Sequence, residues 1–187
     1  PCNDELYLVN ADGSGLRRLT RNAAADAQAA WSPDGRKIAF ISWRDGEAGE
    51  IYVMNADGTD QRRLTRTHGD EGDLAWSPDA TKIAFTGTGA GRLRDAYVLN
   101  ADGTNQQQLT ATATSEEGDL HWSPDGRQIA TILVKEGKQQ IWVRALDSLE
   151  FSPLAGTDGA ESPFWSPDSR YIAFFADAKL KKIETLA

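Results

Sequence analysis

The chain has 187 residues, of which 20 are Lys or Arg and 28 are Asp or Glu, so its formal net charge is −8. Nucleic-acid binding needs a basic surface, and we therefore expect no nucleic-acid partner. No apolar run approaches the roughly 20 residues of a membrane-spanning helix, so we expect no membrane span. The single cysteine, Cys2, excludes an intrachain disulfide and a multi-cysteine metal site. Because the sequence opens on Pro1, we interpret it as a processed form or a fragment, in which a signal peptide would not be visible.

Two phrases recur along the chain and set a repeat with a spacing near 45 residues. The phrase Trp-Ser-Pro-Asp begins at Trp31, Trp76, Trp122 and Trp165. The phrase Asn-Ala-Asp-Gly alternates with it and begins at Asn10, Asn55 and Asn100. Two different phrases that recur with the same spacing are typical of a repeat architecture. We place the repeats at about 5–20 (partial), 26–65, 71–110, 117–155 and 160–187 (partial).

Turn chemistry divides each repeat into four short strands. The chain enters at 5–9, which we predict to be a third strand, and the first complete repeat opens with a strand that ends at Trp31. A Ser-Pro-Asp-Gly turn leads into a second strand over 37–41, because proline presets one turn dihedral and glycine accepts the next. A third strand over 51–54 turns through Asn-Ala-Asp-Gly into a fourth over 61–65. The last predicted element is again a third strand, 180–183, and no segment has a long helical period.

Four short antiparallel strands per repeat predict an all-β fold, a β-propeller in which each repeat is one four-stranded blade. The segment WSPDGRKIAF followed by IYVMNADGTDQRRLT resembles the TolB-like β-propeller repeats, which are relatives of WD-type repeats, and the resemblance covers roughly Glu5 to Glu184. Such blades occur in TolB itself, in propellers joined to peptidases or polysaccharide lyases, and in sensor regions of bacterial receptor kinases. The segment FWSPDSRYIAFFADAKLKKIE is most similar to that last group.

Residues 1–187 therefore form a single propeller domain or a fragment of one, and the closure of the ring stays open at this point. One alternative is a four-bladed ring, in which the C-terminal first and second strands pair with the N-terminal third and fourth strands. The others are a piece of a six- to eight-bladed ring and an eight-bladed ring closed by two copies. Unpaired blade edges favour self-association.

Acidic residues precede each repeated tryptophan, at the start of the predicted innermost strands. If these positions face the mouth of the central channel, their mutual repulsion favours a hard cation such as Ca²⁺, or else a solvated acidic rim. The candidate metal ligands are Asp26, Glu71, Asp73, Glu117, Asp119 and Glu161. We expect no other cofactor. The aspartates of the repeated phrases are interpreted as turn formers instead, because Asp bonds the backbone amides of its own turn.

Trp43 and Arg44 break the repeat and are our candidate partner-binding residues. They follow the second strand of one blade only, and an exposed aromatic next to an arginine is typical of an interface anchor. The alternative is a tryptophan that covers its own blade. The two histidines, His68 and His121, have no accompanying nucleophile motif, so we predict that the chain is not an enzyme.

The sequence favours a non-catalytic propeller scaffold that binds a protein or peptide partner. The alternative function is an accessory or sensor propeller from a larger peptidase, polysaccharide lyase or receptor kinase. The resemblance to TolB implies a periplasmic or extracellular location. We expect the partner to contact the loops that break the repeat, because binding residues of propellers lie on such loops. The expected function rests on analogy with other proteins of the same fold.

Overall fold

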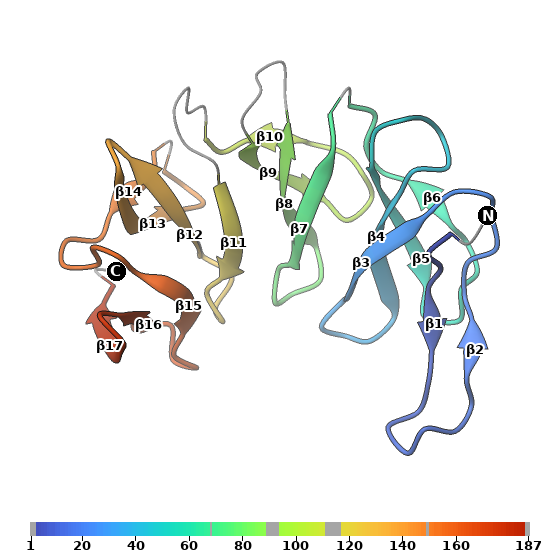
Figure 1. Cartoon of the computed structure of the whole chain (residues 1–187), viewed down its shortest axis with the longest axis horizontal. Coiled ribbons are helices and arrows are strands. Elements are labelled where there is room, and N and C mark those ends of the chain that lie inside the picture. The colour runs from blue at the N-terminus through green and yellow to red at the C-terminus, as the bar shows by residue number, and fades with distance from the viewer. Residues whose placement is uncertain (1–2, 68, 89–93, 111–116, 149, 186–187) are drawn as a thin grey trace.

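The computed structural model describes the chain except residues 1–2, 68, 89–93, 111–116, 149 and 186–187. The described residues form strands and turns, arranged as five small antiparallel sheets along an arc (Figure 1). The strands of the first two sheets are β1 (Tyr7–Leu8), β2 (Arg17–Arg18), β3 (Asp26–Trp31), β4 (Lys37–Ser42), β5 (Glu50–Asn55) and β6 (Arg62–Arg63). Those of the third and fourth are β7 (Glu71–Trp76), β8 (Lys82–Thr88), β9 (Arg94–Asn100), β10 (Gln107–Gln108), β11 (Glu117–Trp122), β12 (Gln128–Lys135), β13 (Lys138–Ala145) and β14 (Ser152–Pro153). The fifth holds β15 (Glu161–Trp165), β16 (Tyr171–Ala176) and β17 (Lys179–Glu184).

The second, third and fourth sheets are four-stranded meanders, with strand order β3-β4-β5-β6, β7-β8-β9-β10 and β11-β12-β13-β14. This arrangement confirms the predicted all-β propeller architecture of four-stranded antiparallel blades. The first sheet contains only β1 and β2 among the described residues, and the fifth contains β15, β16 and β17. These two incomplete sheets lie at opposite ends of the arc and do not pair, so the chain does not close a four-bladed ring on itself in this structure (Figure 1).

The repeated aspartates act as turn formers, as the sequence predicts. In the first complete repeat Ser32 Oγ donates to Asp34 Oδ1 at 2.6 Å, and the same carboxylate accepts the backbone amide of Arg36 at 3.1 Å. Gly35 follows with a φ of 69°, which glycine adopts without steric cost. These bonds hold the pKa of the Asp34 carboxyl below its usual value. The turn therefore has a local role that accounts for the repetition of Asp.

Neighbouring sheets are joined by the repeated tryptophans. The indole of Trp76 donates its Nε1 hydrogen to the carbonyl of Ala30 in the preceding sheet at 3.1 Å. The later repeats reproduce this bond from Trp122 to Ala75 at 3.0 Å and from Trp165 to His121 at 3.1 Å. Apolar clusters fill the space between sheets, for example Ile41, Ile51, Trp76 and Phe85 between the second and third. Within the part of the chain that the structure describes, no helix has the length and apolar character needed to cross a membrane.

Candidate functional site

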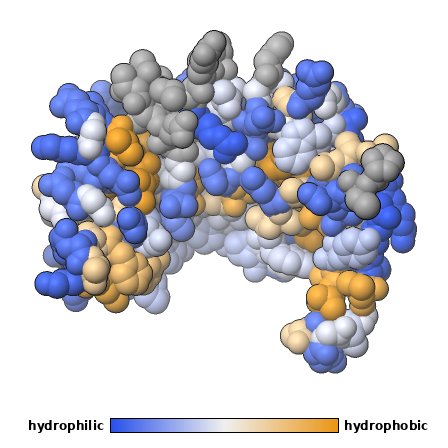
Figure 2. All heavy atoms as spheres, in the orientation of Figure 1, coloured by the Kyte–Doolittle hydropathy of each residue, from blue (hydrophilic) through white to orange (hydrophobic). Residues whose placement is uncertain are grey.

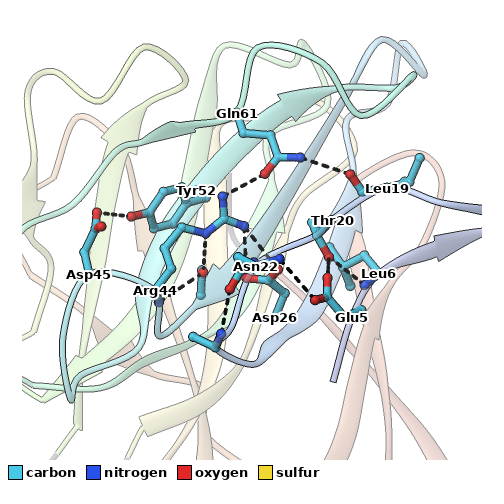
Figure 3. A network of polar contacts seen from close by, with 12 residues as sticks. Glu5, Leu6, Leu19, Thr20, Asn22, Asp26, Arg44, Asp45, Tyr52 and Gln61 are labelled. Carbon is cyan, nitrogen blue, oxygen red and sulfur yellow. Dashed lines mark hydrogen bonds and ion pairs between the residues drawn. The ribbon is translucent and has the colours of Figure 1, made fainter. Parts of the chain in front are cut away.

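Asp26 and Arg44 bind each other in the second sheet. The Asp26 carboxylate is buried at the start of β3, and Arg44 Nη2 lies 3.1 Å from each of its two oxygens. Arg44 also donates to Gln61 Oε1 at 2.7 Å, as Figure 3 shows, and to Ser42 Oγ at 2.8 Å. Its guanidinium lies 4.7 Å from the ring centroid of Tyr52, within range of a cation–π interaction. The predicted channel-mouth position of Asp26 is therefore corrected: Asp26 fixes an arginine inside the sheet.

Glu71, which occupies the matching position in the next repeat, is also buried instead of lying at a channel mouth. Its carboxylate accepts the backbone amide of Ile51 at 2.9 Å and the hydroxyls of Thr65 and Thr67. The pKa of Glu71 is raised to about 7, chiefly by burial and also by the nearby Glu50 carboxylate, while the three hydrogen bonds lower it and offset part of the rise. Glu71 thus connects β5 to the residues that follow β6, and it holds a proton near neutral pH.

A β-bulge in each innermost strand explains where the other predicted ligands lie. The register between the first and second strands shifts at the same place in all four repeats. One residue at each shift has a φ between 48° and 53°, and these residues are Gln28, Asp73, Asp119 and Ser162. Because a bulge inserts one extra residue, the residues on its two sides no longer alternate as in a regular strand. Asp73 and Asp119 therefore reach solvent while Asp26 and Glu71 turn inward.

The predicted cation ligands that the structure describes do not form a metal-binding cluster. The Asp73 carboxylate accepts Thr86 Oγ1 at 2.8 Å and lies 3.8 Å from Arg94 Nη1, so it has partners of its own. Asp119 and Glu161 are exposed in different sheets. Glu117 lies at the start of β11, and its side chain is outside the described part of the structure. In the described residues no group of three His, Cys, Asp or Glu side chains is arranged to hold a metal ion.

Trp43 covers its own blade. Its indole packs on the hydrophobic cluster around Ile41, against the backbone of Gly49, and Nε1 donates to Asp70 Oδ1 at 3.3 Å. The same Asp70 oxygen accepts the amide of Gly49 at 2.8 Å, so the tryptophan is held over a connection between the second and third sheets. The half-buried indole leaves part of its surface to solvent. A partner contact at Trp43 stays a prediction, as it does at the internally bonded Arg44.

A cleft of about 700 Å³ lies between the fourth and fifth sheets, on the side of the repeated Ser-Pro-Asp turns. Its wall combines the turn from β11 to β12, the turn after β13 and the ends of β16 and β17. The charged residues around it are Asp125, Arg127, Asp147, Arg170 and Glu184. Arg170 and Glu184, which both belong to the fifth sheet, pair with each other on one wall of the cleft at 3.2 Å. Leu146 contributes an apolar surface to the same wall.

Substitutions in the fourth repeat remove a pair of side chains that other repeats place here. Lys37 Nζ donates to Asn55 Oδ1 at 3.3 Å across β4 and β5, and Lys82 does the same to Asn100 at 2.9 Å. In the fourth sheet the paired positions hold Gln128 and Ala145 instead. The Oε1 atom of Gln128 is buried and accepts no hydrogen bond within the described chain. An unsatisfied buried acceptor is costly and favours an external donor.

A bridging arginine is also missing from this junction. Arg17 reaches the carbonyl of Ala56 in the next sheet at 3.5 Å, and Arg62 reaches that of Ala101 at 3.3 Å. The corresponding position of the fourth sheet is Ser152, whose side chain is too short to cross. The sequence reasoning missed this cleft. The departure of Ala145-Leu146-Asp147-Ser148 from Asn-Ala-Asp-Gly was its visible signal.

A profile of the TolB beta propeller domain family matches residues 47–186. The chain belongs to this family. A TolB homolog from Chlorobium chlorochromatii is 45% identical over 42 residues, which are 22% of this chain and 10% of that protein. The agreement confirms the resemblance that the repeated phrases carry.

Solved structures show the same fold at low sequence identity. The TolB structure from Acinetobacter baumannii has a TM-score of 0.71 at 19% identity, over 95% of this chain and 45% of that one. An oligogalacturonate lyase from Vibrio parahaemolyticus has a TM-score of 0.75 at 13% identity, over 98% of this chain and 58% of that one. The chain thus spans less than two thirds of each of these relatives. Because these neighbours include TolB and a lyase, the shared fold alone does not choose a function.

Proposed function

We propose that this TolB-type propeller is a non-catalytic scaffold that binds a protein or peptide segment in the cleft between the fourth and fifth sheets. The buried, unpartnered Oε1 of Gln128 in the wall of this cleft carries the proposal. A peptide backbone supplies N–H donors along its length, and one of them would satisfy that oxygen once the Gln128 side chain turns toward the cleft. Binding sites in folded scaffolds combine an apolar surface with a few such polar groups.

The charges around the cleft define the kind of segment that fits. Three carboxylates and two guanidinium groups give the rim one net negative charge. The Glu184 carboxylate is already paired with Arg170, whereas Asp147 is exposed beside Leu146. A segment with a Lys or Arg side chain next to an apolar one matches this arrangement, because opposite charges at the rim favour association and register.

The absence of catalysis is part of the same proposal. The His121 imidazole is partly buried, and desolvation lowers its pKa. Among the described residues no serine, threonine or cysteine side chain is hydrogen-bonded to it, so no nucleophile and base are paired there. His68 lies outside the described residues. We expect purified protein to show no hydrolase or lyase turnover.

The second candidate function is an accessory propeller of a larger enzyme. The observation in its favour is the match to oligogalacturonate lyase, of which the chain spans 58%. In that case the cleft would contact another domain of the parent protein. We further propose a periplasmic or extracellular location, on the family relationship to TolB. Fractionation of cells that express the parent gene tests the location.

Selection of a peptide library against the purified chain tests the scaffold role. We expect enriched peptides to carry a basic residue beside an apolar one and to lose at least tenfold in affinity when Leu146→Arg fills the cleft. Trp43→Ala is the matched variant at the other candidate surface, and it should leave binding unchanged. Loss of binding with Trp43→Ala alone would move the site to that loop. Peptides that bind Leu146→Arg and Trp43→Ala as tightly as they bind the original chain would contradict both candidate sites.

A further inference from the structure

The third sheet has a small cavity at the place where the second sheet holds the Arg44 guanidinium. Its walls come from the connection between β6 and β7, from β8 and β9, and from the residue before β10. The cavity measures about 50 Å³, whereas one water molecule needs roughly 10–15 Å³, so a group of about four heavy atoms fits inside. A guanidinium group is of that size.

The repeat relates this cavity to the surroundings of Arg44 residue by residue. In the second sheet the Arg44 guanidinium is held by a carboxylate, an amide, a hydroxyl and two aromatic rings, which belong to Asp26, Gln61, Ser42, Phe40 and Tyr52. The residues 45 positions later are Glu71, Gln106, Gly87, Phe85 and Tyr97, and all five line the cavity. The third sheet therefore repeats the walls of an arginine site.

The arginine itself is not repeated. The position 45 residues after Arg44 is Gly89, which has no side chain and lies outside the described residues. Gln61 is half-buried and bonded to Arg44, whereas Gln106 is exposed and makes no hydrogen bond within the described chain. The amide that would complete the site is therefore present and accessible.

The fourth sheet places a cation at the corresponding ring in another way. Lys135 Nζ lies 5.4 Å from the ring centroid of Trp142, which faces Thr131 as Tyr97 faces Phe85. The second and fourth sheets thus each hold a cation against the aromatic residue of the third strand. The described part of the third sheet has the ring without the cation.

The carboxylate in the cavity wall has no cation of its own. Glu71 is 2% exposed, and no Lys, Arg or His side chain of the described chain is paired with it. The nearby Glu50, in contrast, is paired with Arg63 at 2.5 Å. Glu71 Oε1 accepts one bond, from Thr67 at 3.2 Å, and an ionised carboxylate oxygen can accept a second. A cation in the cavity would favour the charged form, which burial otherwise opposes.

We propose that this cavity binds a guanidinium group from outside the chain, carried by an arginine side chain of a protein or peptide partner. Its plane would lie against Tyr97, as that of Arg44 lies against Tyr52, and its N–H groups would donate to Glu71 and Gln106. The exposed Gln106 and the half-buried Thr88 line the side of the cavity that solvent reaches.

The surface around the third sheet suits a charged side chain. Figure 2 shows mostly hydrophilic side chains over the middle of the arc, where the third sheet lies, and larger hydrophobic areas toward the two ends. A polar surface offers little apolar area to a partner, so a deep contact by one charged side chain fits it better than a broad apolar contact. The site is separate from the cleft between the fourth and fifth sheets and does not depend on it.

Titration with N-acetyl-L-arginine amide tests the site. The full chain is kept at pH 8, where Glu71 is mostly ionised, and NMR signals of the Phe85 and Tyr97 rings report on the cavity. We expect saturable shifts with a dissociation constant of about 1 mM, and guanidinium chloride should compete. N-acetyl-L-lysine amide should bind roughly threefold more weakly, because an ammonium group lacks the planar fork of donors.

Substitutions locate the binding. Glu71→Gln keeps the shape of the side chain and removes its charge, so it should weaken binding about tenfold. Glu50→Gln is the matched control, because Glu50 is paired with Arg63 and does not line the cavity. Leu146→Arg, which fills the cleft of the proposed function, should leave this titration unchanged, so a failure of either site is seen separately.

Arg44→Gly extends the test to the second sheet, where it opens the matching cavity. Millimolar guanidinium chloride should raise the melting temperature of Arg44→Gly more than that of the original chain. The proposal is overturned if the original chain shows no saturable shift, or if Glu71→Gln binds as tightly as the original chain. Arg92, outside the described residues, is the arginine nearest to Gly89 in the sequence. Binding that appears only in Arg92→Gln would also overturn the proposal, because the chain would then fill the cavity itself.

Discussion

Arg44 and Asp26 form an ion pair inside the second sheet, with Arg44 Nη2 3.1 Å from both carboxylate oxygens. The Asp26 side chain is fully buried and that of Arg44 is 19% exposed. Asn22 Nδ2 donates to the same carboxylate at 2.5 Å, so the buried charge is both paired and hydrogen-bonded. Breaking such a pair leaves an uncompensated charge, which costs more than the intact pair contributes.

We therefore expect Asp26→Ala to lower the free energy of unfolding by about 3 kcal/mol, because it strands the Arg44 guanidinium. Arg44→Met should cost a similar amount, since it keeps the stem but strands the carboxylate. The double variant should be less destabilised than the sum of the two, and urea titration measures all three. The exposed Arg36, beside Asp34, is the control, and Arg36→Ala should change little. Additive losses would show that the two side chains act independently.

The raised pKa of Glu71 predicts a pH dependence of stability. Its pKa is about 7 in the folded chain and near the ordinary 4.5 in the unfolded chain. Below pH 4.5 the group is protonated in both states and costs nothing. Between pH 4.5 and 7 the unfolded chain ionises first, so the free energy of unfolding falls as pH rises. The expected loss from Glu71 is about 3 kcal/mol across this interval.

Carboxylates with a lowered pKa, such as Asp34 and Asp79, change the free energy of unfolding with pH in the opposite direction. They are present in both the original chain and Glu71→Gln, so the difference in stability between these two proteins isolates the contribution of Glu71. Urea midpoints at several pH values give the difference. The stability gain from Glu71→Gln should grow from pH 4.5 to 7 and then level off. A difference that is constant with pH would show that Glu71 titrates normally.

The repeat made most of the fold predictable from the sequence. Trp31 and its copies mark the ends of the innermost strands, and the second and third strands of the first complete repeat lie within one residue of their predicted ranges. Turn residues such as Pro33 and Gly35 have fixed dihedral preferences, so their local geometry follows from their identity. The fourth strands proved shorter, at two residues each, because polar edge positions carry little pairing signal.

The candidate site was less predictable, for physical reasons that particular residues show. The bulges fall at Gln28 and Asp73, and neither is a glycine that would mark a left-handed residue. Without the bulge, alternation places Asp26 on the wrong face. The interest of the cleft lies in the buried Oε1 of Gln128, which has no hydrogen-bond donor within the described chain. Such an unsatisfied acceptor can be recognised only when the positions of the neighbouring strands are known. Long-range pairing such as Arg44 with Asp26 likewise needs the fold.

The turn after Trp76 provides a reciprocal test of backbone strain. Ala80 has a φ of 59° at the position that Gly35 and Gly126 fill in other repeats. A left-handed residue with a Cβ is strained, so Ala80→Gly should raise the free energy of unfolding by about 0.5 kcal/mol, after the entropy cost of glycine. Gly126→Ala should lower it by about 1 kcal/mol. A Cβ at Gly126 would lie 3.6 Å from Pro78, an ordinary contact, so strain and not collision is tested. If both variants changed the free energy of unfolding in the same direction, backbone strain would not explain the effects.

Calcium at millimolar concentration should leave the melting temperature unchanged. The reason is the separation of the acidic groups: Asp26 is bound to Arg44, Glu71 holds a proton near neutral pH, and Asp73 already accepts Thr86. A hard cation needs six or more oxygen ligands converging on one point, and these carboxylates are turned to different partners. Scanning calorimetry with calcium, with magnesium and with a chelator measures the effect. A calcium-specific rise that Asp119→Asn abolishes would show instead that the exposed bulge carboxylates gather around a cation, as their place at the start of the innermost strands first suggested.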